Sequence, residues 1–128
     1  MKKKVGLMQR NHVKLISMDT IPIEEVKWLL YPFIPLGKIT ILQGDPGEGK
    51  TTLALQIIAA LTTGKPVWEG APPMEPVNVI YQTAEDGLSD TIKPRLVAAG
   101  ADCARVMVID DSDRVLKLDD DRLEQAIE

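Results

Sequence analysis

The sequence has one cysteine (Cys103), one histidine (His12) and only 4% aromatic residues in 128 positions. A lone cysteine cannot form an internal disulfide, which excludes a small domain held together by disulfides. No stretch approaches the roughly 20 apolar residues of a membrane-spanning helix, and the basic start is not followed by the apolar segment of a signal peptide. We therefore expect one modest globular domain in the cytoplasm, with no membrane partner.

Acidic residues outnumber basic ones by 19 to 15, and the two signs are unevenly placed. Residues 1–18 carry five basic side chains and no acid, whereas residues 110–128 carry eight acids against three bases. A basic segment can contact phosphate backbones, but it is more often a solvated tail, and we interpret residues 1–20 as a basic N-terminal extension. The acidic balance of the chain argues against a dedicated nucleic-acid surface.

Apolar, β-branched runs alternate with segments of helical periodicity along the chain. The pattern predicts buried strands over residues 38–43, 77–82 and 106–109, and helices over residues 50–63 and 88–99. Gly64 is well placed to end the first helix, and Pro94 should kink or restart the second. Strands that alternate with helices predict βαβ crossovers, and hence an α/β fold whose mainly parallel sheet is covered on both faces.

Two further segments flank this core. The aromatic residues Trp28, Tyr31 and Phe33 precede the first strand, and we expect them to pack under the sheet. At the other end, residues 121–124 have the pattern of a capping box that opens a last helix, with Leu123, Ala126 and Ile127 directed inward.

The decisive motif is a complete G-x-x-x-x-G-K-[ST] pattern between the first predicted strand and the first predicted helix. Gly44 lets the chain leave the strand sharply, while Gly47 and Gly49 lack a Cβ, so that their amides can close around a phosphate. Backbone amides at a helix N-terminus favour an anion, because the helix dipole places partial positive charge there. The motif predicts a nucleoside triphosphate site formed by Gly44, Asp45, Pro46, Gly47, Glu48, Gly49, Lys50, Thr51 and Thr52.

Three side chains of this segment have distinct expected roles. Lys50 carries a full charge toward the β- and γ-phosphates and is a predicted catalytic residue. The hydroxyl of Thr51 is expected to ligate a Mg²⁺ ion that bridges those phosphates, and Thr52 to reach the α-phosphate. ATP and Mg²⁺ are therefore the predicted cofactors.

Segments on both sides of the motif carry a family resemblance. Before it stand Trp28-Leu29-Leu30 and Ile34-Pro35-Leu36-Gly37-Lys38, and after it stand Tyr81-Gln82-Thr83-Ala84-Glu85-Asp86-Gly87 and Asp90-Thr91-Ile92-Lys93-Pro94-Arg95-Leu96. Over about residues 22–128 the chain resembles the RecA-like P-loop ATPases of the AAA family type, especially the RepA-like hexameric replicative helicases of plasmids and phages. The resemblance implies a RecA-like three-layer α/β/α fold and ATP hydrolysis in a homo-oligomeric, hexameric ring. It also implies action in DNA replication, recombination or mobile-element maintenance.

The resemblance also implies a role for Glu85 that agrees with the chemistry of its place. A carboxylate at the C-terminal end of a strand beside the P-loop strand faces the γ-phosphate, where it can orient and deprotonate the attacking water. Glu85 is therefore the predicted catalytic base, whereas we interpret Asp86 as a helix cap or an indirect contributor.

Asp110 and Asp111 follow the last predicted strand and would suit a metal. In the RecA-like order, however, the strand at this position is an intermediate one, and the metal-binding strand comes later. We favour a strand end and a turn with Ser112-Asp113, and the metal role of the two aspartates stays open.

On this reading, residues 21–128 are the N-terminal part of a RecA-like ATPase domain, with the Walker A motif and without the Walker B aspartate. We expect ATP hydrolysis in the full-length protein, weak or no activity in this part, and nucleic acid contacts through the rest of the domain. Two other functions stay open, a KaiC-like ATP switch that is not a motor and a nucleotide-binding fragment without turnover. A small-metabolite kinase is less favoured, because no arginine-rich lid is present.

Overall fold

The computed structural model describes residues 12–84, 87–112 and 114–128 of the chain. The chain divides into two units, residues 1–41 and residues 42–128, and each is described by itself. In the described ranges, no helix combines the length and the apolar character needed to cross a membrane.

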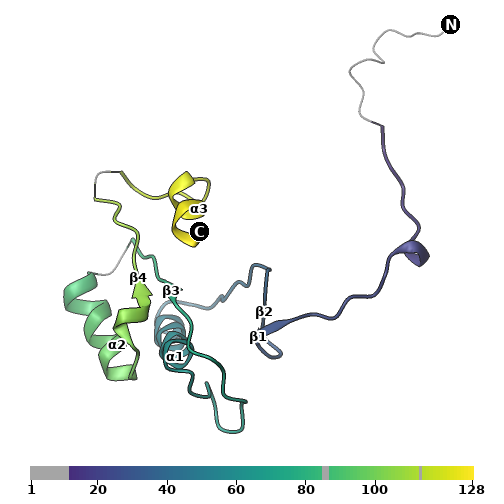
Figure 1. Ribbon diagram of the computed structural model, residues 1–128. Coiled ribbons are helices and arrows are strands. Elements are labelled where there is room, and N and C mark those ends of the chain that lie inside the picture. The colour runs from purple at the N-terminus through teal and green to yellow at the C-terminus, as the bar shows by residue number, and fades with distance from the viewer. Residues whose placement is uncertain (1–11, 85–86, 113) are drawn as a thin grey trace, which may run out of the picture. The chain divides into compact units, whose positions relative to one another are not determined.

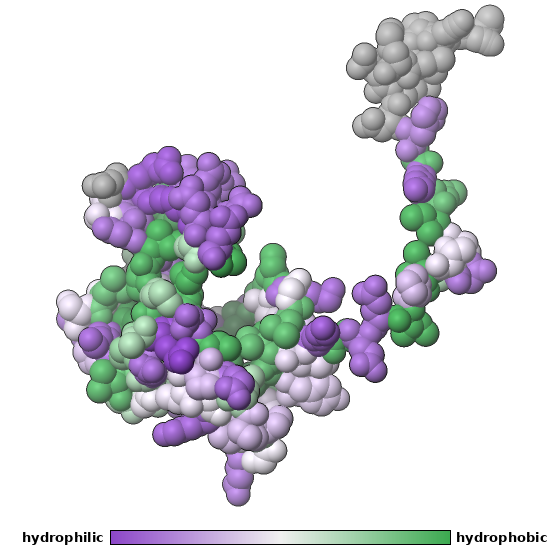
Figure 2. Space-filling view, viewed as in Figure 1, coloured by the Kyte–Doolittle hydropathy of each residue, from purple (hydrophilic) through white to green (hydrophobic). Residues whose placement is uncertain are grey.

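The first unit is largely extended and contains one short antiparallel hairpin. A 3₁₀ turn, η2 (Met18–Thr20), precedes strands β1 (Trp28–Leu30) and β2 (Ile34–Pro35). The backbone N–H of Leu36 donates to the carbonyl of Lys27 at 2.8 Å. Ahead of the hairpin, apolar side chains stand on the surface of the extended segment, as Figure 2 shows.

The expectation that the aromatic residues of this region are core residues is wrong. Trp28 is 37% exposed, Tyr31 68% and Phe33 64%. The rings of Trp28 and Tyr31 meet edge to face, with their centroids 5.3 Å apart. A two-stranded hairpin offers little surface to bury them, and only Leu30 of the hairpin is fully buried.

The strand predicted over residues 38–43 does not form. Residues 39–43 have no regular secondary structure, and Ile39 and Ile41 are 92% and 82% exposed. A strand exists only when a neighbour completes its ladder of hydrogen bonds. Among the described residues, the strands pair only as β1 with β2 and as β3 with β4, so this apolar segment has no partner strand.

Helix α1 (Lys50–Thr63) has the bounds that the sequence predicts. It ends at Gly64, whose φ of 75° lies in the left-handed region that glycine adopts without strain. A Cβ at Gly64 would also stand 2.5 Å from the carbonyl oxygen of Met74, because the loop after the helix folds back against it. The glycine that ends the helix therefore also allows the chain to return toward β3.

The second predicted helix is present and restarts where proline predicts. A π-helical turn, η3 (Leu88–Ile92), leads directly into α2 (Lys93–Ala99), with Pro94 in the first turn of α2. A proline lacks an N–H and is tolerated in a first turn, where that donor would have no partner in the helix. Gly100 ends α2 in the left-handed conformation with a φ of 82°.

The second and third predicted strands form in shortened versions, as a parallel pair. Strand β3 (Val79–Ile80) pairs with β4 (Val106–Met107), which follows the 3₁₀ turn η4 (Cys103–Arg105). Figure 1 shows α1 and α2 beside this pair. The chain is therefore a small α/β protein with two small sheets, one of them parallel. The described residues do not form the complete three-layer α/β/α arrangement that the resemblance implies.

The hydrophobic core lies where the two helices meet the parallel pair. Its buried residues are two from α1 and two from η3 and α2 (Leu55, Ile58, Ile92, Leu96). Partly buried residues from and just after β3, and from the segment between α2 and the start of β4, pack against them (Val79, Tyr81, Ala101, Cys103, Val106). The buried hydroxyl of Thr62 adds a polar tie, since it donates to the carbonyl of Ile58 at 2.9 Å and accepts from the N–H of Asp102 at 3.1 Å.

Leu55 is the core residue whose removal should cost the most stability. Its side chain is 2% exposed, and truncating a buried leucine to alanine typically costs about 2–5 kcal/mol, partly through the cavity that it leaves. We expect Leu55→Ala to lower the free energy of unfolding by about 3 kcal/mol in denaturant titrations. Leu53→Ala on the same helix is the matched control, because Leu53 is 43% exposed. Equal losses in both variants would contradict this placement of the core.

The last helix, α3 (Asp121–Ile127), begins one residue away from the predicted cap. Its N-cap is Asp120, whose carboxylate accepts from the backbone N–H of Arg122 at 3.0 Å. The expected inward face is also wrong in part, because Leu123 is half-buried while Ala126 and Ile127 are exposed. Asp120 takes the capping position because it receives the guanidinium of Arg122 as well as its backbone N–H.

Candidate phosphate-binding site

The loop before α1 leaves a set of backbone donors without partners inside the helix. The first helical hydrogen bond runs from the N–H of Leu53 to the carbonyl of Gly49 at 2.9 Å. The N–H groups of residues 50–52 therefore have no acceptor within α1. The N-cap residue is a glycine, so no side chain caps this end, and the first turn carries no acidic residue. This helix end is thus free to receive an anion.

Two glycines shape the loop around that helix end. Gly47 and Gly49 have φ values of 83° and 86°, a conformation that other residues rarely adopt. A Cβ built on either glycine meets no atom within 4 Å, so both face open space. A side chain at either position would be strained by the positive φ, whatever the space around it. The predicted phosphate contacts of this loop stay a prediction.

The ammonium group of Lys50 lies against the start of the same loop. Its Nζ donates to the carbonyl of Gly44 at 2.6 Å and to the carbonyl of Asp45 at 2.8 Å. The lysine charge therefore bridges from the first turn of α1 back to the beginning of the motif. An anion at the helix end would lie within reach of this charge, because the residue that carries it belongs to the same turn.

Glu48 has a structural role in the loop that the sequence analysis missed. Its Oε2 accepts from the N–H of Asp45 at 2.8 Å, while its own N–H donates to the carbonyl of Asp45 at 3.3 Å. A Cβ added to Gly44 would stand only 2.7 Å from Oε2, so the glycine makes room for this carboxylate. A glutamate three residues after a residue whose N–H it can accept is a known local pattern, and the spacing of Asp45 and Glu48 could have revealed this role.

The remaining motif residues lie in the loop or in the first turn of α1. Asp45 and Pro46 are exposed, Thr51 is half-buried in the first turn of α1, and Thr52 is exposed. Thr52 also lines a cavity of about 420 Å³ between α1 and α2, together with Leu55, Gln56, Arg95, Ala98 and Ala99. The motif thus opens beside a cavity with an arginine on its far wall.

The segment that carries the predicted catalytic base lies only partly within the described residues. Glu85 and Asp86 lie outside them, so the structure does not test either role. The described residues before them, 81–84, follow β3 without regular secondary structure. The side-chain amide of Gln82 bonds both backbone groups of Ile109, through Nε2 to the carbonyl at 3.2 Å and through Oε1 to the N–H at 3.1 Å.

Asp110 forms a turn, as the favoured interpretation predicted. Its Oδ1 accepts from the backbone N–H of Ser112 at 3.0 Å. Hydrogen bonds from Ser112 hold the pKa of Asp110 below its ordinary value, with a smaller contribution from the charge of Arg122. In residues 12–84, 87–112 and 114–128, no cluster of three or more His, Cys, Asp or Glu side chains is arranged to hold a metal. Asp113 lies outside these ranges.

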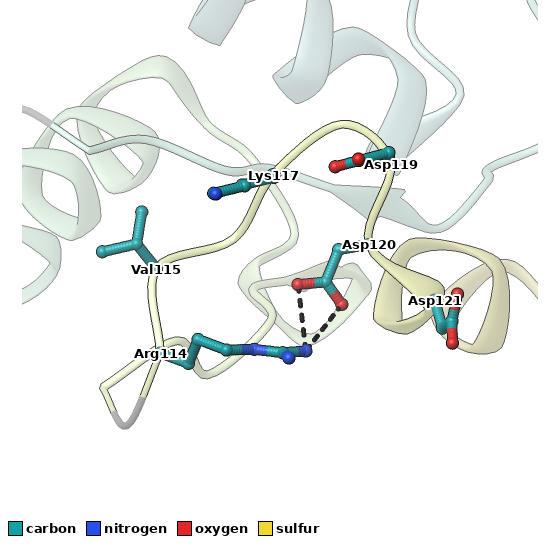
Figure 3. Close-up of a pocket in the computed structure, with 6 residues that line it drawn as sticks. All are labelled: Arg114, Val115, Lys117, Asp119, Asp120 and Asp121. Carbon is teal, nitrogen blue, oxygen red and sulfur yellow. Dashed lines mark hydrogen bonds and ion pairs between the residues drawn. The ribbon is translucent and has the colours of Figure 1, made fainter.

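A second charged cluster, which was not predicted from the sequence, lies in the loop before α3 and at its start. Figure 3 shows Asp120 facing Arg114, while Asp121 lies on α3. The Asp120 side chain is 6% exposed, and both of its oxygens accept from Arg114 at 3.3 Å. Arg122 donates to the same carboxylate at 2.8 Å and to the carbonyl of Arg114 at 2.9 Å. This network holds the loop together, and no P-loop residue contributes to it.

The pairing with Arg122 predicts a dependence of stability on pH. The guanidinium and backbone N–H of Arg122 hold the pKa of Asp120 well below its ordinary value of about 3.9. A carboxyl whose pKa is depressed by folding stabilises the native state above its unfolded pKa, and this contribution is lost as the pH falls toward the folded pKa.

We therefore expect wild type to have a higher thermal midpoint than Asp120→Asn at pH 5–7, with a difference that begins to shrink below about pH 4. Asp119→Asn is the matched control, since Asp119 is exposed and its substitution changes the net charge equally. A difference between wild type and Asp120→Asn that stays constant from pH 7 to pH 2 would contradict the assignment.

Comparison with known proteins agrees with the P-loop geometry. A family model described as "AAA domain" matches residues 7–128. Among curated proteins, NFX1-type zinc finger-containing protein 1 of Mus musculus is 31% identical over 67 residues, and the protein of the same name from Homo sapiens is 30% identical over 67 residues. Each alignment covers 52% of this chain, but the chain spans only 4% of the length of either relative. No solved structure matches.

The family match covers nearly the whole chain and includes both the phosphate-binding loop and the segments that follow it. The family match indicates a nucleotide-binding ATPase domain of the P-loop type. The chain belongs to the AAA domain family of P-loop ATPases.

Proposed function

We propose that the chain binds Mg²⁺-ATP and that the full-length protein hydrolyses it as a RecA-like, RepA-like ATPase. The observation that carries this proposal is the uncapped N-terminus of α1 with Lys50 in its first turn. The free N–H groups, the open space at Gly47 and Gly49 and the lysine charge are together the features that a triphosphate requires. The family match supports the same reading.

Different residues of the chain would bind the phosphates, hold the metal ion and activate the water. The amides of the loop and of the first turn of α1 hold the β-phosphate, and Lys50 neutralises charge on the β- and γ-phosphates. The hydroxyl of Thr51 would hold Mg²⁺, which when bound screens the phosphate charge and orients the γ-phosphate. Glu85 accepts a proton from the attacking water, so that the water becomes the nucleophile.

We propose that the nucleoside of ATP binds in the cavity beside Thr52. It adjoins the end of the phosphate loop, and its volume of about 420 Å³ is large enough for a purine and its sugar. Arg95 offers a planar guanidinium that can stack on a base, and Gln56 offers an amide that can both donate and accept hydrogen bonds. We place the base of ATP between these two side chains.

We further propose, from the resemblance, that the full-length protein forms a hexameric ring and acts on DNA in replication, recombination or mobile-element maintenance. The KaiC-like switch is the alternative for a ring of this kind that is not a motor. A third candidate, nucleotide binding without turnover, is favoured by one observation. Asp110, which could supply the second acidic group of a triphosphatase site, accepts a hydrogen bond from the backbone N–H of Ser112 through one of its two carboxylate oxygens.

One experiment separates these candidates. A fluorescent ATP analogue is titrated into the full-length protein with and without Mg²⁺, and phosphate release is followed on the same samples. Saturable binding with release supports an ATPase, and binding without release supports the third candidate. Competition by inorganic triphosphate tests the phosphate site alone, whereas preference for ATP over other nucleoside triphosphates tests the nucleoside cavity. Absence of saturable binding would contradict the proposal.

A further inference from the structure

The loop between α1 and β3 contains a segment, residues 71–77, in which burial repeats at every third residue. The first, fourth and seventh residues are half-buried, whereas the four residues between them are exposed (Ala71, Met74, Val77; Pro72, Pro73, Glu75, Pro76). This repeat matches neither an α-helix nor a β-strand. It is typical of a polyproline II helix, which has three residues per turn and no internal hydrogen bonds. We call residues 71–77 the proline segment.

The composition of the proline segment favours this conformation. The ring of each proline fixes φ at about −65°, which is the polyproline II value. The residue before a proline is also driven from the helical region into the extended one, and this restricts Ala71, Pro72 and Glu75. The structure gives residues 71–78 no regular secondary structure of the helix or strand type, as these restrictions require.

The half-buried edge of the proline segment is tied to the C-terminal end of α1. The N–H of Met74 donates to the carbonyl of Gly64 at 3.3 Å, and the N–H of Val77 donates to the carbonyl of Leu61 at 2.9 Å. Carbonyls in the last turn of a helix have no donor within that helix, so the second bond also satisfies the end of α1. The proline segment is therefore held in place before any partner binds.

The exposed side of the proline segment carries two Xaa-Pro pairs in succession. Residues three apart lie on one edge of a polyproline II helix, so Pro73 and Pro76 share one outer edge while Pro72 and Glu75 share the other. Grooves lined with aromatic rings bind segments of this kind, because the fixed conformation loses little entropy on binding. Within the described ranges, no cation forms an ion pair with Glu75, so its charge is available to a partner.

We propose that the proline segment is a docking site for a partner protein whose groove is lined with aromatic side chains and carries a cation beside them. Pro73 and Pro76 lie between the rings, and Glu75 pairs with the cation. The site goes beyond the proposed function, since the proline segment bonds the C-terminal end of α1 whereas the phosphate-binding loop precedes its N-terminus. Substitutions on the exposed edges should therefore leave ATP affinity unchanged.

The test combines the protein with a purified WW domain, a module whose groove is formed by aromatic rings, chosen to carry an arginine beside that groove. Binding is followed through the chemical shifts of the WW domain. Pro73→Ala and Pro76→Ala each remove one ring from the same outer edge. Pro66→Ala is the matched control, since Pro66 is exposed in the same loop but lies outside the proline segment. Hydrogen exchange at the Val77 amide reports whether each variant keeps the segment anchored.

We expect saturable binding of the wild-type protein to the WW domain. Pro73→Ala and Pro76→Ala should each weaken it by about tenfold or more, as the truncation of an anchor residue does, with exchange at Val77 close to wild type. Pro66→Ala should bind as wild type does. Glu75→Gln should weaken binding to the WW domain, but not to a form of that domain in which the arginine is replaced by alanine.

Several results would overturn the proposal. One is the absence of saturable shifts at millimolar concentrations of the wild-type protein. Another is equal binding by wild type, Pro73→Ala and Pro76→Ala. A third is loss of binding only together with fast exchange at Val77, which would indicate a general structural role. An effect of Glu75→Gln that persists without the arginine would contradict the pairing with a cation. Failure of the proposed function is distinguishable, because it is an absence of ATP binding by wild type.

Discussion

Lys50→Ala is expected to weaken the binding of Mg²⁺-ATP by about 10- to 100-fold. Hydrogen bonds to charged groups are worth about 1.5–3 kcal/mol, and each 1.4 kcal/mol corresponds to a tenfold change in affinity. The ammonium of Lys50 is held at the start of the loop by the carbonyls of Gly44 and Asp45, within the turn that would receive the phosphates. Alanine removes that charge, while the amides of α1 remain. The measurement is titration of a fluorescent ATP analogue in the presence of Mg²⁺.

The control for this variant is Lys65→Ala, which removes the same charge from an exposed position just beyond the end of α1. Its dissociation constant should equal that of wild type. Lys50→Arg provides a second comparison, because a planar guanidinium keeps the charge but not the compact point-like geometry of an ammonium. If Lys50→Ala and Lys65→Ala bound the nucleotide equally well, the site would lie elsewhere and the proposed function would be wrong.

In the full-length protein, Glu85→Gln should reduce phosphate release by a factor of about 100 or more while leaving nucleotide affinity nearly unchanged. General base catalysis contributes about 10²–10⁴-fold, and glutamine retains the size of glutamate but cannot take a proton from water at neutral pH. The expected signature is a bound nucleotide that is not cleaved. Single-turnover phosphate release on a saturated sample measures it directly.

Glu75→Gln is the matched control for this second variant, since Glu75 is an exposed glutamate in the loop before β3. Phosphate release in Glu85→Gln within twofold of wild type would show that Glu85 is not the base. A loss of affinity equal to the loss of rate would instead assign Glu85 to nucleotide binding.

The local part of the structure could be predicted from the sequence, because its signals lie within a few residues of each other. Helix α1 begins at Lys50 and ends before Gly64 as expected, since a glycine loop precedes it and a left-handed glycine ends it. The restart at Pro94 follows from the chemistry of one residue. The P-loop conformation likewise depends on glycines that the motif itself supplies.

The parts that could not be predicted depend on partners far away in the sequence. The apolar run at residues 38–43 has the composition of a buried strand, but composition cannot provide the neighbour that a strand requires. The bonds between Gln82 and Ile109 join residues 27 positions apart, and no local pattern marks a glutamine that replaces a backbone pair. The position of the α3 cap at Asp120 was decided by the guanidinium of Arg122, whose orientation a capping pattern does not specify.

The carbonyls of Gly44 and Asp45 accept hydrogen bonds from the Lys50 ammonium. These two backbone carbonyls take the place of water around the ammonium group, so the charge is hydrogen-bonded and held in one position. Under the proposed function, binding of a phosphate would exchange the oxygen ligands around this nitrogen, from carbonyl to phosphoryl. The affinity of the proposed site would then depend on the difference between these two sets of oxygens, so a substitution that alters the loop carbonyls would change ATP affinity without contacting the nucleotide.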